Sequence, residues 1–375
     1  MFNNAMRGLV FVLIAGLGTL TVAASARSPK DYRATVIARA QVWKATDIPS
    51  MDLKTGPKGE KAFTFAAPVT CTYLKKKLPG KTPKFDCRIE PDDDVKVKYG
   101  GNNSEVYGEV VATRLLWALG FGADRQYSVR VVCRGCPGSF GGVDRSPKES
   151  VFDPAMIERK MPGAAFEPND AWSWDELNLV DEKAGGAARA QRDALKLLAV
   201  FMQHGDNKPE QQRLICRDQP KEKGQEKTPA HKGREIPPCE HPFMYLHDVG
   251  LTFGRANKLN QDAVGGMNLA EWSRTPVWKD SSTTQTTAAC VGNLPKSLTG
   301  TLVDPPISEE GRQFLAGLLV QLSDEQLRGL FEAARVQLRL RNQTDVLSGF
   351  ATVDEWVAAF KTKRDQIVNR HCSTS

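Results

Sequence analysis

The hydrophobic pattern between residues 62 and 132 is typical of β-strands interrupted by one helix. Phe, Val and Thr are dense over residues 63–73, and a second strand-like run covers residues 84–89. Residues 95–99 alternate strictly between valine or tyrosine and lysine, which predicts a strand with one apolar and one basic face. Residues 126–132 predict a further strand.

Helical periodicity appears once in this β-rich part and dominates the second half of the chain. Apolar residues recur at helical spacing over residues 104–120, and residues 187–204 carry the clearest apolar stripe. Ser323–Gln326 and Thr352–Glu355 each have the spacing of a capping box before an amphipathic run. Both boxes predict helix starts.

The order of these elements predicts an α+β fold with two lobes. A β-rich lobe with one helix would span residues 27–165, and a mainly helical lobe would span residues 166–375. The residues between Cys216 and Cys239 are charged and rich in proline, so we expect them to form an insertion loop rather than core.

The first 26 residues have the three parts of a cleavable signal peptide. Arg7 supplies a positive charge, residues 9–17 are apolar, and Ala24-Ser25-Ala26 offers small residues to a signal peptidase. The alternative is a membrane anchor over residues 9–26, but glycine, threonine and serine interrupt that run, and it falls short of the ~20 residues that a bilayer needs. We therefore expect an exported protein, either periplasmic or secreted.

Charge adds little to this picture. The 51 lysines and arginines and 44 acidic residues are interleaved along most of the chain, so no nucleic-acid partner is indicated. The mature part has no other 18-residue apolar run, so no membrane span is expected there. The pattern leaves the oligomeric state open.

The eight cysteines agree with folding in an oxidising compartment. Proximity along the chain suggests the pairs Cys71–Cys87, Cys133–Cys136 and Cys216–Cys239, which leaves Cys290–Cys372, although eight cysteines allow 105 connectivities. Two alternatives stay open. Cys133-Arg-Gly-Cys136 has the spacing of a redox dithiol, and Cys239 with His241 and His247 could bind a metal.

The strongest chemical signal is the polar segment His204–Gln211, directly after a predicted helix. Asp206 in such a position could accept a hydroxyl proton, and Lys208 could neutralise a phosphate in transfer. The side-chain amide of Gln211 could reach a metal ion. Asp248 follows a strand-like apolar run and precedes a glycine, which suits an aspartate that binds Mg²⁺.

These two segments resemble motifs of protein kinases. His204–Gln211 is similar to the H-R-D-x-K-P-E-N catalytic loop, and Asp248-Val-Gly250 resembles D-F-G. The resemblance implies that Lys98, on the alternating strand, meets the nucleotide phosphates. It also implies that Glu109, on the next helix, pairs with Lys98 and fixes its position.

Within the kinases, the chain most resembles the HipA-type and phosphoinositide-kinase-like group. Gly80–Phe85 is similar to the G-x-Q-P-K phosphate-binding loop, which would give Lys84 a phosphate contact. Glu109 precedes Leu115 by six residues, as in the E-x5-L helix of that group, and Ile157–Arg159 resembles the strand before the hinge between lobes. The same resemblance assigns Glu158 to nucleotide binding, and it covers roughly half of the mature chain.

The resemblance implies a two-lobed kinase-like phosphotransferase that uses ATP or another nucleotide with Mg²⁺ on an unknown protein or small-molecule acceptor. Asp206 and Lys208 would be catalytic, and Asp248 and Gln211 would bind the metal. Gln211 stands where the family has asparagine, and no G-x-G-x-x-G loop precedes Lys98. An inactive kinase-like binding module of the cell envelope is therefore an alternative, and a thiol-disulfide protein using Cys133 is a further one.

Overall fold

The structure is a computed structural model that describes most of the chain. The described residues are 29–59, 61–78, 80, 82–137, 149–166, 169–219, 238–255, 266–279 and 290–373. The predicted signal peptide and most of the predicted insertion loop lie outside these residues.

Five strands and α2 form the β-rich part, which α1 precedes and the other helices follow in the chain. The strands of this part are β1 (Pro68–Leu74), β2 (Lys84–Ile89), β3 (Asp93–Tyr99), β4 (Arg125–Arg134) and β5 (Glu149–Arg159). The remaining strands are β6 (Ala164–Ala165), β7 (Gln212–Cys216), β8 (Pro242–Leu246), β9 (Cys290–Val291) and β10 (Pro306–Ile307). The helices are α1 (Pro29–Ala38), α2 (Glu105–Ala118), α3 (Arg189–Phe201), α4 (Leu269–Arg274), α5 (Glu309–Leu319), α6 (Asp324–Ala333) and α7 (Val353–Val368).

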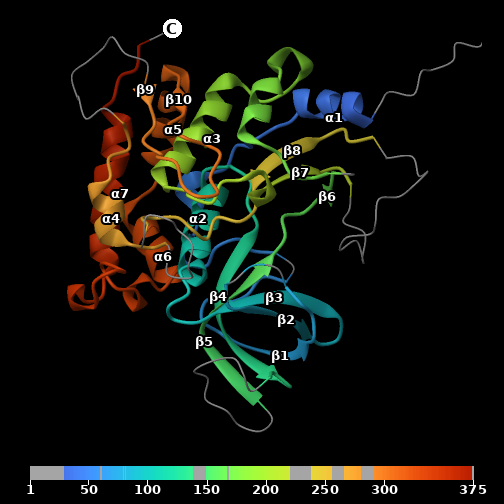
Figure 1. The fold of residues 1–375 in the computed structure, drawn as a ribbon, viewed down its shortest axis with the longest axis vertical. Helices are drawn as coiled ribbons and strands as arrows, with labels where there is room; N and C mark the ends of the chain where they lie inside the picture. Colours follow the sequence, from blue (N-terminus) through green and yellow to red (C-terminus); the bar gives the residue numbers. More distant parts are fainter. Residues whose placement is uncertain are drawn as a thin grey trace, which may run out of the picture.

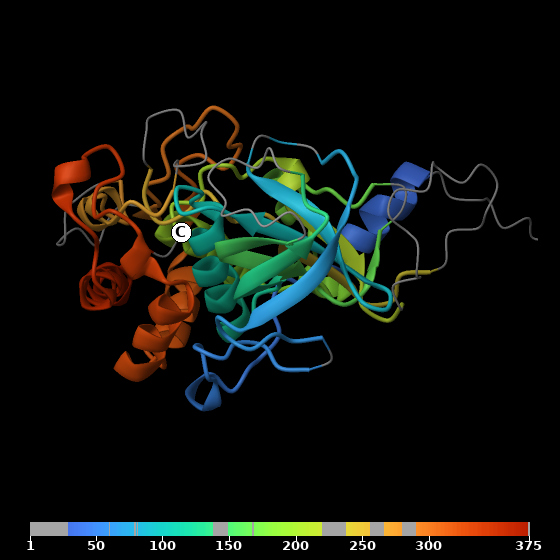
Figure 2. The same cartoon turned by 90° about the horizontal axis from the view of Figure 1, so that it is seen from below.

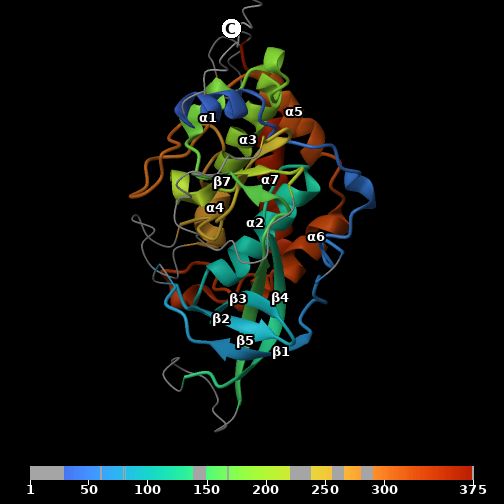
Figure 3. The same ribbon diagram turned by 90° about the vertical axis from the view of Figure 1, so that its right-hand side faces the viewer.

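The first five strands close into a barrel in the order β1-β2-β3-β5-β4. All neighbours are antiparallel except β1 and β4, which pair in parallel and close the ring. The barrel lies at one end of the long axis of the molecule, and the helices gather toward the other end (Figures 1 and 3). The protein therefore has a mixed α+β fold, as the order of patterns predicted.

The barrel interior explains the alternation over residues 95–99. Val95 and Val97 are buried in a cluster with residues of the other four strands, and Tyr99 packs against that cluster. Because successive side chains of a strand point to opposite faces, Lys96 and Lys98 lie on the outer face of β3. The prediction of one apolar and one basic face is confirmed.

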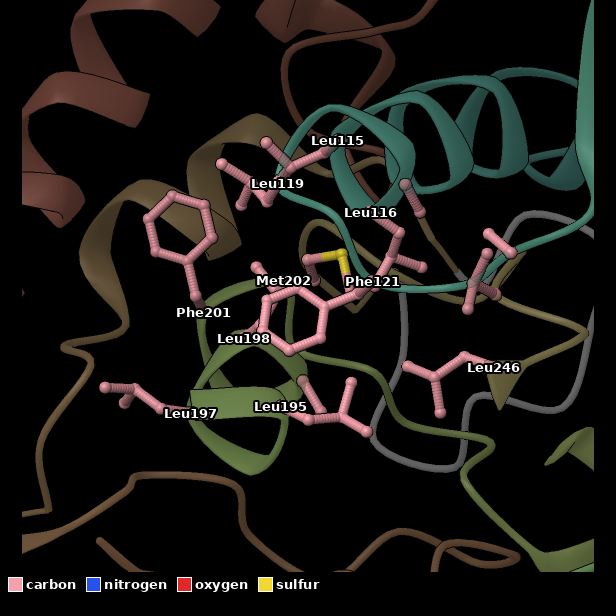
Figure 4. Close-up of a cluster of buried hydrophobic side chains, with 14 of the residues drawn as sticks. Leu115, Leu116, Leu119, Phe121, Leu195, Leu197, Leu198, Phe201, Met202 and Leu246 are labelled. Atoms are coloured by element: carbon pink, nitrogen blue, oxygen red, sulfur yellow. The ribbon is translucent and has the colours of Figure 1, made fainter. Parts of the chain in front are cut away.

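A second, larger hydrophobic core joins the helices and the three-stranded sheet β6-β7-β8. Helix α2 lies between the barrel and this core and contacts both β4 and α6 (Figure 1). Its last turn packs Leu115, Leu116 and Leu119 against the apolar face of α3, close to Leu246 of β8 (Figure 4). Burial of each such leucine stabilises the fold by roughly 1.5–3 kcal/mol.

The amino-terminal residues belong to this larger core rather than to the barrel. Val36, Val42 and Leu53 are part of it, and α1 lies on the side of the molecule opposite α6 and α7 (Figure 2). The sequence assigned these residues to the β-rich lobe. The structure packs this amino-terminal segment on the helical core instead. The lobe boundary at residue 165 stays a prediction.

Several local predictions are confirmed. The predicted helices 104–120 and 187–204 appear as α2 and α3. Both capping boxes form, with Ser323 accepting from the amide of Gln326 at 3.1 Å and Thr352 accepting from that of Glu355 at 3.2 Å. The predicted strand 63–73 starts later, at Pro68, and β7 had no clear pattern because it is short and buried.

The cysteines form four disulfides, in the predicted pairs. They are Cys71–Cys87, Cys133–Cys136, Cys216–Cys239 and Cys290–Cys372. Cys133 is completely buried in the barrel core, whereas reactive cysteines are typically partly exposed, which favours a structural role for that pair. No helix of the described residues is long and apolar enough to cross a bilayer.

The predicted metal site that includes Cys239 is wrong. Cys239 is bonded to Cys216 and has no thiolate to offer. His241 is exposed and lies near Asp218, whereas the ring of His247 contacts Asp124. The two histidines are at opposite ends of β8 and do not converge.

A buried lysine on α7 should make stability depend on pH. Lys363 is 1% exposed, donates to the carbonyl of Thr275 at 2.6 Å and lies over the ring of Trp272. Burial lowers the pKa of Lys363 to about 7. Between pH 7 and the unfolded-state value near 10.5 the unfolded chain binds more protons, so this lysine makes stability rise with pH in that window.

Lys363→Met should remove this dependence. We expect the free energy of unfolding of the wild type to gain about 2 kcal/mol relative to the variant from pH 7 to pH 9. Urea unfolding of both proteins across this range measures it. A constant difference between the two curves would contradict the prediction.

Candidate functional site

Lys98 is held between two glutamates of α2. Its ammonium lies 2.6 Å from a carboxylate oxygen of Glu105 and also contacts Glu109. Lys98 is 3% exposed and Glu109 1% exposed. The structure thus places the predicted Lys98–Glu109 pair in direct contact and adds Glu105 to it.

The turn between β3 and α2 sets this geometry. Asn103 accepts a hydrogen bond from the backbone amide of Glu105 at 3.1 Å, and its own amide donates to the carbonyl of Tyr99 at 3.1 Å. Residues four apart share one face of a helix, so Glu105 and Glu109 both point toward Lys98. That spacing was the signal by which sequence reasoning could have found Glu105.

Asp248 completes a cluster of three carboxylates around Lys98. One oxygen each of Glu105, Glu109 and Asp248 lie within 4.8 Å of one another. One carboxylate oxygen of Glu109, Oε2, is buried and has no hydrogen-bond partner among the residues that the structure describes. Buried acceptors are normally satisfied, so this oxygen could take a further donor or cation.

The charges in the cluster are unequal. Burial acts to raise the pKa of Asp248, but Lys98 and His247 hold it below its usual value. Burial raises the pKa of Glu109 well above its usual value, against the effect of Lys98. Burial lowers the pKa of Lys98, but the three carboxylates outweigh it and hold that pKa well above normal. Asp248 and Lys98 are therefore charged at neutral pH.

Two glycines allow α2 to approach the segment after β8. A Cβ on Gly250 would lie 2.4 Å from Cγ of Glu105, and a Cβ on Gly108 would lie 2.7 Å from the carbonyl oxygen of Gly250. The distance at Gly108 is too short for any other residue without a shift of the backbone, and a side chain at Gly250 would displace that of Glu105. The close approach brings Asp248 to the helix face that carries Glu105.

The described part of the predicted phosphate-binding loop borders the same cluster. Thr82 donates its hydroxyl to Glu105 at 2.6 Å, and Lys84 lies opposite Lys98 in the register of β2 and β3. Burial and the nearby charge of Lys98 lower the pKa of Lys84. Gly80 has φ +85° and lies beside the ammonium of Lys84. The side chains of Lys84 and Lys98 thus both lie next to this loop.

Asp206 is fixed by its neighbours in the predicted catalytic loop. Its carboxylate accepts from Lys208 at 3.0 Å and from the side-chain amide of Gln211 at 2.7 Å. The backbone carbonyl of Gln211 accepts from the amide of Asp248 at 3.2 Å. Gln211 therefore connects the loop of Asp206 to the segment of Asp248.

Asn207 anchors this loop, and sequence reasoning missed it. Its side-chain oxygen accepts from the amides of Thr301 and Leu302, both at 2.7 Å. Its backbone carbonyl accepts from the indole of Trp174 at 3.0 Å. These partners lie far along the chain, so no local pattern indicated them.

His204, which opens the loop, is a packing residue. Its ring is fully buried, and neither nitrogen has a hydrogen-bond partner among the described ranges of the chain. Burial lowers the pKa of His204 to about 4. The ring is therefore neutral at physiological pH.

Comparisons with known proteins give a weak structural likeness. No protein-family model matches the sequence, and no curated protein matches it. Among solved structures, the proinflammatory kinase CtkA of Helicobacter pylori is similar over 79% of this chain and 92% of that chain, with 10% identity and a TM-score of 0.38. At these values the likeness carries no argument for a family or an activity.

Glu158 lies in a second buried cluster. Its carboxylate is 3.1 Å from the ammonium of Lys96 and also contacts Lys160. Asp124 and His247 belong to the same group. The carboxylate of Glu158 is thus paired with two lysines. Its assignment to nucleotide binding stays a prediction.

A large cavity lies elsewhere in the molecule. It measures about 650 Å³ and lies beside the start of β8, where Trp43 and Phe243 contribute apolar surface and Arg217 and Asp218 contribute opposite charges. None of the predicted site residues lines it. The candidate site is therefore identified by its buried charges rather than by the size of a cavity.

Proposed function

We propose that this chain is an exported phosphotransferase with a two-lobed, kinase-like fold that uses a nucleotide and Mg²⁺. The observation that carries the proposal is the buried ammonium of Lys98, which Glu109 and Glu105 hold beside Asp248. A lysine fixed by a helix glutamate and close to an aspartate is the arrangement that protein kinases use for the donor phosphates.

Each side chain has a role in this proposal. Lys98 and Lys84 bind the phosphates of the nucleotide, and Glu109 holds Lys98 in place. Asp206 accepts the proton of the acceptor hydroxyl, and Lys208 stabilises the charge that develops on the transferred group. These groups position the two substrates and neutralise the charge of the phosphates, and phosphoryl transfer needs little more from the protein.

The donor set fits Mg²⁺. Asp248 and the amide oxygen of Gln211 would hold the ion, since hard oxygen ligands suit it, and one oxygen each of Glu105, Glu109 and Asp248 lie close enough together to share a cation. Bound there, Mg²⁺ would neutralise phosphate charge. The disulfides and the predicted signal peptide support export, where ATP is expected to be scarce, so other nucleotides belong in the test.

Nucleotide binding tests the proposal directly. The melting temperature of the mature protein should rise with ATP or another nucleotide in the presence of Mg²⁺, because a ligand that binds only the folded state stabilises it. Asp248→Ala should abolish the rise. Asp345→Ala, which changes an exposed aspartate at a distant helix start, should keep it. No shift of the wild type with any nucleotide and metal would refute the proposal.

An inactive binding module has one observation in its favour. Both Lys208 and Gln211 engage the carboxylate of Asp206, which leaves the proposed base less free to accept a proton. Such a module would bind nucleotide or an envelope partner without turnover. Product formation by the wild type separates the two functions.

A further inference from the structure

Asp124 connects its own segment to two others next to the candidate site. It stands between α2 and β4 and is 1% exposed. One carboxylate oxygen accepts from the backbone amide of Met161 at 2.8 Å and from the hydroxyl of Tyr245 at 3.1 Å. The other lies 2.7 Å from Nδ1 of His247 and 3.2 Å from the ammonium of Lys160.

These contacts come from the elements that carry the site. The segment before Asp124 follows α2, the helix of Glu109, and pairs with β8 through a bridge between Ala123 and Leu246. Lys160 and Met161 follow β5, the strand that lies beside β3 in the barrel. His247 directly precedes Asp248. A single carboxylate thus ties the helix, the barrel and the metal-binding segment together.

The surroundings of Asp124 stabilise the charged, deprotonated form of its carboxylate. Burial acts to raise the pKa of Asp124, but Lys160 and His247 hold it at about 2. Burial of a charge costs several kcal/mol unless it is paired and hydrogen-bonded. Here four donors satisfy it.

We propose that Asp124 is a positioning residue that fixes His247, and through it Asp248, relative to Lys98 and Glu109. This role rests on the proposed function. Residues hydrogen-bonded to metal ligands orient them, and their loss typically costs 10- to 100-fold in metal affinity or activity. Asp124 contacts the neighbour of the ligand Asp248, so we expect the lower end of that range. Asp124 would act on the site only through its neighbours.

The test measures two Mg²⁺ concentrations. One gives half of the maximal nucleotide-dependent thermal shift, and the other gives half of the maximal rate. Asp124→Asn should raise both concentrations about 10-fold. Asp218→Asn is the matched control, because Asp218 also lies near a histidine and accepts backbone amides at the other end of β8, far from the cluster. It should leave both values unchanged.

A second variant keeps the test valid if Asp124→Asn folds poorly. His247→Gln removes the same contact from the other side and leaves Asp124 charged. The two substitutions should raise the half-saturating Mg²⁺ by similar factors, and the double variant should add little, since residues in one network are not additive. Independent effects that multiply in the double variant would overturn the role.

The outcomes separate this inference from the proposed function. A wild type without any response to Mg²⁺ and nucleotide overturns the proposed function and the positioning role with it. A wild type that responds, with Asp124→Asn and His247→Gln both within twofold of its half-saturating Mg²⁺, overturns the positioning role alone. A tenfold rise in both variants supports it.

Discussion

Asp206→Asn is expected to lower the rate of phosphoryl transfer by about 10²- to 10⁴-fold, the usual contribution of a positioned general base. Asparagine has nearly the same shape and keeps one oxygen that can accept from Lys208. It cannot take up the proton of the acceptor. The structure places this carboxylate beside the segment of Asp248, with Gln211 bound to both.

The same variant should keep its nucleotide-dependent thermal shift, because the phosphate-binding groups are untouched. Rates are measured with each nucleotide that stabilises the wild type, and Asp345→Asn is the control. If the variant turned over as fast as the wild type, Asp206 would not be the base. If the wild type bound nucleotide but formed no product, the binding module would be the better description.

Removal of the Cys290–Cys372 disulfide should cause the largest loss of stability among the four. Its cysteines are 82 residues apart, and the chain-entropy relation gives about 4.5 kcal/mol for a loop of that size. The bond ties β9 to the residues after α7, at the end of the helical core. The double variant Cys290→Ala with Cys372→Ala should therefore unfold at much lower urea concentration.

The Cys133–Cys136 pair provides the matched comparison. Its cysteines are 3 residues apart, and the same relation gives about 2 kcal/mol. Equilibrium unfolding of the two double-alanine variants measures both losses under identical conditions. An equal or larger loss for the short loop would show that packing around the cysteines, rather than loop closure, determines their effect.

The resemblance to kinase motifs implied most of the candidate site. It assigned Lys98 and Glu109 their roles, and the local pattern only placed Lys98 on an alternating strand and Glu109 on the helix that follows. Such motifs can be recognised in a sequence because their residues are close together in the chain. The segments of Asp206 and Asp248 were recognisable as motifs, and the structure brings both to Gln211.

Sequence reasoning missed other parts of the site. Glu105 shares Lys98 with Glu109, and its spacing of four residues from Glu109 was a signal that was not used. Asn207 had no local signal, because it holds the loop of Asp206 through residues almost a hundred positions away. Glu158 was assigned to the nucleotide, but its carboxylate lies against Lys96 and Lys160. Partners of this kind depend on which segments meet in space.

The sequence by itself determined the alternation of strands and helices and the two capping boxes, because each depends on spacing over a short range. Proximity suggested three of the four cysteine pairs, and the distant pair Cys290–Cys372 followed only as the remainder. Only the tertiary structure decided that β1 closes the barrel against β4 and that Lys98, on the outer face of β3, is buried rather than exposed. It alone gathered Asp124, Lys160 and His247 into one network. Long-range packing sets burial and charge pairing, and these turn an ordinary strand lysine into the centre of a site.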